Sequence, residues 1–212
     1  MESEIMLTDE MRFLLSSLSK PEAIQTYLES LPYVSEELNR SPLRVIRDRQ
    51  CHCLDGALLA ALALRLLGYP ARIIDMVPVP DIDDDHVLAI YQVKGCYGAV
   101  AKSNFVGLRY REPVYRSVRE LVMSYFDVFY NVDGLKTLRA YTRPLNLAAY
   151  DRFGWQTSEA GVEKIVTRLY SQKTIPVIEP GRAAGLSRMD KRSYEAGMIG
   201  LNFEGLYKKP GR

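Results

Sequence analysis

The sequence is poor in cysteine and carries almost no net charge. Three cysteines, a low and odd number, do not make the disulfide framework of a small secreted protein. The cysteine content therefore predicts a cytoplasmic protein with reduced thiols. The 28 basic and 26 acidic side chains leave a formal charge of +2, so nothing in the total charge points to a nucleic-acid partner.

Long hydrophobic runs are also missing. No uninterrupted apolar stretch approaches the roughly 20 residues that a membrane-spanning helix needs, so we expect no membrane association. The first residues, MESEIMLTDEMRF, carry acids where a secretory signal peptide carries bases, and we therefore expect no signal peptide. The remaining composition, 47% hydrophobic and 25% charged, is that of an ordinary globular protein.

A length of 212 residues is enough for one domain with a substantial core. Thr8 can cap a first helix, and Pro21 is well placed as the first residue of a second. We expect N-terminal helices in residues 1–40, a catalytic core in residues 41–130, and a mostly helical extension in residues 131–212.

The most informative stretch is residues 51–72, CHCLDGALLAALALRLLGYPAR. It is apolar without a break from Gly56 to Leu64, and Gly68 closes it, which predicts a buried helix from about Cys53 to Leu67. The N-terminal end of a helix gathers free N–H groups and the positive end of the macrodipole. A thiol at that position is expected to have a lowered pKa, and the thiolate is the nucleophilic form.

This stretch resembles the nucleophile helix of the transglutaminase-like superfamily. Members of that family carry a cysteine, then an aspartate and an alanine at fixed spacing, and an L-R-x-L-G-x-P-A-R ending. The resemblance selects Cys53 rather than Cys51 as the nucleophile. It implies an α+β, papain/transglutaminase-like fold, in which the nucleophile helix packs on an antiparallel sheet and further helices lie at both ends. The matching residues are Cys53, Asp55, Ala57, Arg65, Gly68, Pro70, Ala71 and Arg72.

The same resemblance implies that His86 is the general base, because His86 opens an apolar stretch typical of a central strand. The aspartate that usually orients this histidine from the next strand is missing, since residues 94–110 contain no acid. Hairpin geometry leaves two substitutes. A three-residue loop places Asn104 opposite His86, and a two-residue loop places Ser103 there. We choose Asn104, because an asparagine can orient a catalytic histidine.

The function implied by the resemblance is that of a cysteine hydrolase or acyltransferase. Cys53 would attack an amide or ester carbonyl and carry the acyl group as a thioester, with water or an amine as the acceptor. The expected substrate is a peptide, a protein or a small amide, and no cofactor or metal is expected.

Two alternatives belong to other functional classes. One is a binding protein on the same fold with a disabled site, because the family's aspartate and tryptophan are missing. The other is a zinc protein that uses Cys51, Cys53, His86 and Cys96, although a C-x-C pair with distant single ligands fits structural zinc spacing poorly.

Overall fold

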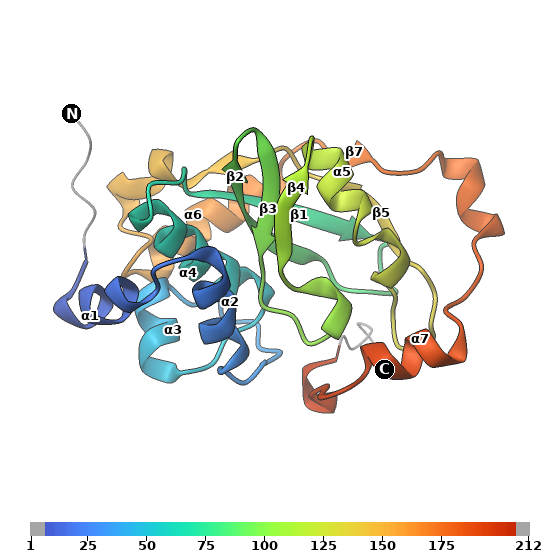
Figure 1. Ribbon diagram of the computed structural model, residues 1–212, viewed down its shortest axis with the longest axis horizontal. Coiled ribbons are helices and arrows are strands. Elements are labelled where there is room, and N and C mark those ends of the chain that lie inside the picture. The colour runs from blue at the N-terminus through green and yellow to red at the C-terminus, as the bar shows by residue number, and fades with distance from the viewer. Residues whose placement is uncertain (1–6, 207–212) are drawn as a thin grey trace.

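The computed structural model describes residues 7–206, and its centre is an antiparallel sheet (Figure 1). The strands follow the order β4-β3-β2-β1-β5-β7, and β6 also pairs with β1. Their bounds are β1 (Arg72–Pro78), β2 (His86–Val93), β3 (Cys96–Val100), β4 (Arg111–Tyr115), β5 (Leu138–Tyr141), β6 (Leu145–Asn146) and β7 (Ile175–Pro176). Helices packed on this antiparallel sheet confirm the predicted α+β class.

Seven α-helices surround the sheet in the described residues. They are α1 (Asp9–Ser17), α2 (Pro21–Glu29), α3 (Pro42–Asp48), α4 (Cys53–Leu66), α5 (Val118–Met123), α6 (Glu159–Tyr170) and α7 (Lys191–Gly197). The hydroxyl of Thr8 caps α1 by accepting from the N–H of Met11, and Pro21 is the first residue of α2, as the sequence predicted. Within residues 7–206, no helix combines the length and the apolar character needed to cross a bilayer.

Helix α4 is the centre of the larger hydrophobic core. It runs from Cys53 to Leu66, within one residue of the predicted end, and twelve of its fourteen residues are buried. Leucine and alanine, which dominate it, have high helix propensity. The helix stops at Gly68, whose φ of +90° is unfavourable for any residue with a Cβ.

The two faces of β2 belong to different cores. Val87, Ala89 and Tyr91 pack toward α4 in the larger core, whereas Leu88 and Ile90 pack toward α5 in the smaller one. This alternation explains why the strand is apolar on both sides, as its sequence indicated.

The β2–β3 hairpin is tighter than predicted. Val93 pairs with Cys96 across the two-residue loop Lys94-Gly95, in which both residues have positive φ (49° and 82°). The three-residue loop, on which the choice of Asn104 depended, is therefore not the one that forms. Strand β3 ends at Val100, which pairs with Ala89, so the first three residues of β2 have no β3 partner.

Residues after 131 supply strands β5, β6 and β7 of the same central sheet. Strand β5 pairs with β1 through Met76 and Tyr141, and β7 pairs with β5. Helix α6 packs into the same core as α4. The expected boundary at residue 131 therefore falls within one continuous sheet and core.

Candidate active site

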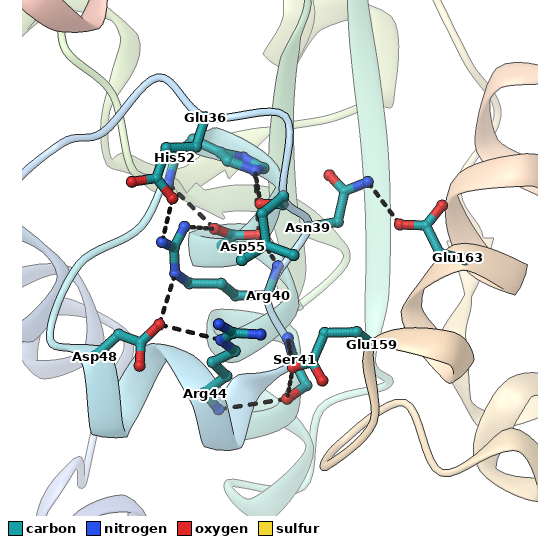
Figure 2. Close-up of polar contacts among 11 residues, drawn as sticks. Glu36, Asn39, Arg40, Ser41, Arg44, Asp48, His52, Asp55, Glu159 and Glu163 are labelled. Carbon is teal, nitrogen blue, oxygen red and sulfur yellow. Dashed lines mark hydrogen bonds and ion pairs between the residues drawn. The ribbon is translucent and has the colours of Figure 1, made fainter.

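A buried charge network holds the N-terminal end of α4 (Figure 2). Asp55, in the first turn, accepts hydrogen bonds from the backbone N–H of Arg40 at 2.7 Å and of His52 at 3.4 Å. The Arg40 guanidinium lies 3.6 Å from the Asp55 carboxylate and donates to Asp48 at 3.1 Å and to Glu36. Burial raises the pKa of Asp55 to about 7, against the opposing effect of Arg40. The network fixes where the helix begins and therefore where Cys53 lies.

The Cys53 thiol lies against the backbone at the start of β2, beside the residues that flank His86 in the sequence. Its Sγ is 3.8 Å from the carbonyl oxygen of Asp85, and the backbone N–H of Val87 also interacts with it. This is the part of β2 that β3 does not cover. The thiol therefore lies beside the backbone on both sides of His86.

The predicted low pKa of Cys53 is wrong. Burial raises the pKa of Cys53 well above the ordinary value, and the carboxyls of Asp85 and Asp84 raise it further. The thiol is 6% exposed, so the thiolate would lose most of its hydration. Cys53 is therefore a protonated thiol near neutral pH.

Carboxyl groups surround the thiol more closely than the sequence suggested. Asp75 of β1 faces the same side as Val87, is 2% exposed, and has a buried Oδ1 with no hydrogen bond. Burial raises the pKa of Asp75, and it raises that of Asp85 to about 7. In the described part of the chain, no cluster of acids, histidines or cysteines is arranged to hold a metal ion.

We predict that these carboxyls make the protein less stable at pH 8 than at pH 6. A raised carboxyl pKa gives a stability contribution that is complete below about pH 4 and is lost as the pH rises through the folded pKa, here about 7 for Asp55 and Asp85. His52 and His86 have lowered pKa values and oppose this trend below about pH 6.5. The net fall in the free energy of unfolding should be about 1–3 kcal/mol.

Urea unfolding at the two pH values measures this difference. Asp85→Asn should reduce the fall. The matched substitution Asp127→Asn should not, because the Asp127 side chain is 81% exposed and is hydrated in both states. Greater stability at pH 8 than at pH 6 would contradict the prediction.

His86 is held by a backbone carbonyl that the sequence does not reveal. It opens β2 as predicted, is 4% exposed, and its Nε2 lies 2.7 Å from the carbonyl oxygen of Leu108. Burial lowers the pKa of His86 to about 4, so the imidazole is neutral at pH 7. Since a carbonyl only accepts, the proton is on Nε2 and the lone pair is on Nδ1. No hydrogen bond joins Nδ1 to Cys53 or to any other described residue.

The reason for choosing Asn104 to orient His86 is wrong. The choice required a three-residue hairpin loop, and the loop has two residues. The Asn104 amide instead pairs with the backbone of Asn202, at 2.8 Å in both directions. Ser103, the alternative, lies beyond the end of β3, and its hydroxyl accepts from the N–H of Phe105. The carbonyl of Leu108, rather than either of these side chains, is the hydrogen-bond partner of His86.

The zinc alternative fails on geometry. Cys96 pairs with Val93 at the far end of β2 from His86, which at the usual rise per residue is roughly 20 Å away. Cys51 is buried against the backbone of Tyr33. The four proposed ligands therefore do not meet at one point.

The arrangement defines a class of protein. A cysteine that begins a buried helix, followed in the chain by a histidine that begins the central strand of an antiparallel sheet, is the order of elements of a papain/transglutaminase-like domain. Residues 5–98 match the family model of the transglutaminase-like superfamily. The matched region includes Cys53 and His86 but ends before Leu108. A search of curated proteins gave no match.

Proposed function

We propose that this protein is a cysteine-dependent hydrolase or acyltransferase that acts on an amide or ester bond through Cys53 and His86. The observation that best supports the proposal is the hydrogen bond from His86 Nε2 to the Leu108 carbonyl. It keeps the basic lone pair on Nδ1, the nitrogen that can take a proton from a thiol. Leu108 then serves the orienting role that an acidic side chain usually has.

The pKa values favour proton transfer during the attack rather than before it. The thiol of Cys53 is protonated and the imidazole of His86 is neutral near pH 7. As Sγ bonds to the carbonyl carbon, Nδ1 accepts the thiol proton directly or through one water. The described residues hold no Sγ–Nδ1 hydrogen bond at rest, so the His86 ring must approach the thiol for this step. The backbone N–H of Cys53 at the start of α4 would help to stabilise the oxyanion. The bond to the leaving group then breaks, and the leaving group takes the proton from Nδ1.

This step leaves an acyl-thioester on Cys53 and a neutral imidazole. Water or an amine, deprotonated by Nδ1, attacks the thioester carbonyl, and the acyl group departs with the acceptor. The proton returns to Sγ and restores the starting thiol. Hydrolysis and transfer share every step except the identity of this acceptor.

The proposal predicts an acetyl adduct on Cys53 after incubation with p-nitrophenyl acetate. Intact-protein and peptide mass spectrometry locate the adduct. Cys53→Ala should abolish it, and Cys51→Ala should leave it unchanged, because Cys51 is fully buried against Tyr33 and has no part in the step. An adduct that persists in Cys53→Ala would contradict the role of Cys53. Failure of Cys53 to acylate at all would favour the binding-protein alternative.

A further inference from the structure

The cavity beside His86 is too small for a substrate. Its volume is about 50 Å³, whereas ligand sites usually have about 300–1,000 Å³. Asp85, His86 and Tyr33 line it from the folded core. Gly205 and Leu206, near the C-terminal end of the described chain, line it from the other side.

We propose that residues 199–206 form a releasable strap that closes the cavity and controls access to Cys53 and His86. The functional part of this proposal rests on the function proposed above. The physical part, that the strap shields the thiol, does not depend on catalysis.

A side-chain latch holds the strap at its middle. Asn202 donates its backbone N–H to Asn104 Oδ1 and accepts from Asn104 Nδ2 through its carbonyl, each at 2.8 Å. Its side-chain Nδ2 donates to the carbonyl oxygen of Tyr33, also at 2.8 Å. These three bonds fasten the strap to the loop after β3 and to the segment before α3.

Tyr33 connects the strap to the thiol. A Cβ added to Gly205 would lie 2.9 Å from Tyr33 Cδ1, so only glycine lets the strap backbone approach the ring this closely. Burial raises the pKa of the Tyr33 hydroxyl, and Cys53 raises it further. Tyr33 and Asp85 line the same cavity as the strap, and the Asp85 carbonyl oxygen lies 3.8 Å from Cys53 Sγ, so the cavity reaches the backbone against which the thiol packs.

The remaining attachment of the strap is weak enough for it to open. Leu201 is its one nearly buried large apolar side chain, at 9% exposure, while Ile199 and Phe203 are each 71% exposed. Segments with few buried apolar contacts open at low free-energy cost. Helix α7 anchors the preceding residues independently, since the Tyr194 hydroxyl donates to the Val132 carbonyl at 2.7 Å. The strap can therefore leave the cavity while α7 stays in place.

The test compares the iodoacetamide labelling rate of Cys53 in the full chain and in Asn104→Ala. Loss of two latch bonds should raise the rate about tenfold. Asn202→Ala, which removes the bond to Tyr33, should also raise it. The matched control Asn146→Ala removes an amide oxygen that accepts from the N–H of Ala148 and caps the 3₁₀ helix Leu147–Phe153, away from the strap, and it should change nothing. Cys96, which lies at the far hairpin end, is the internal reference in every sample.

Unchanged labelling of Cys53 in both latch variants would overturn the strap. Parallel acceleration at Cys53 and Cys51 with a lower urea midpoint would also overturn it, because that result indicates global unfolding. The acetylation assay separates the two proposals. Faster labelling without any acetyl adduct, even in Asn104→Ala, supports the strap and contradicts the proposed function. Acetylation of the native protein with no effect of the latch variants supports the function and contradicts the strap.

Discussion

Asp55→Ala is expected to destabilise the protein by about 3–5 kcal/mol at pH 8. The substitution leaves the Arg40 guanidinium buried beside an empty position, with only its partners Glu36 and Asp48. It also removes the acceptor for the N–H groups of Arg40 and His52. Asp55 is fully buried and Arg40 is 2% exposed, so water does not replace these contacts. Urea unfolding monitored by circular dichroism measures the loss.

Two further variants separate charge from shape. Asp55→Asn retains an oxygen that can accept from the Arg40 N–H, so its cost should be smaller than that of Asp55→Ala. Lys191→Met removes the cation of an exposed pair with Glu195, whose side chains are 89% and 64% exposed. That change should cost less than about 0.5 kcal/mol. A similar small cost for Asp55→Ala would show that the buried network does not stabilise the helix start.

The sequence was most informative where a pattern alone decides the structure. Helix α4 was predicted almost to its ends, because a long apolar stretch that stops at glycine has few alternatives. The position of His86 at the start of β2 was predicted for the same reason. The positions of the thiol and the imidazole in the fold could therefore be predicted, because Cys53 begins α4 and His86 begins β2.

The third part of the site could not be predicted, because it is a backbone atom. Any residue at position 108 offers a carbonyl, so no residue type there reports the bond to His86. The choice of Asn104 depended on hairpin loop length, and a change of one residue in that length reverses every later side chain. Lys94-Gly95 could have indicated the two-residue loop, since a glycine in such a pair favours positive φ.

The pKa of Cys53 was predicted with the wrong sign because two effects compete at the helix start. The macrodipole contributes about 0.3–1 kcal/mol at exposed positions. Full burial shifts a pKa by up to about 3–5 units, which is several times larger in energy. The sequence reveals the helix end, but the burial of Cys53 and the nearby Asp84 and Asp85 appear only in the folded chain.

His86→Gln is expected to lower the rate of Cys53 acetylation by about 10²–10⁴-fold at pH 7. Glutamine approximates the size of histidine and can still donate to the Leu108 carbonyl, but it cannot accept a proton at neutral pH. The matched control is His52→Gln. His52 is the second histidine, and its Nε2 also binds a backbone carbonyl, that of Leu38 at 3.2 Å. Because His52 also lies 3.3 Å from the Asp55 carboxylate at the helix start, its loss should lower the rate somewhat, but far less than the loss of the base.

The pH profile tells a general base from a structural histidine. The pKa of His86 is lowered to about 4 by burial, so the native rate should be nearly level from pH 5 to 8 and should fall only as the imidazole protonates. In His86→Gln no base titrates there, and the rate should rise steadily with pH as the small thiolate fraction of Cys53 grows. If His86 only supported the fold, the substitution would lower the acetylation rate by the same factor at every pH, and the profile would keep its shape. Parallel profiles for the native protein and His86→Gln would therefore exclude His86 as the base.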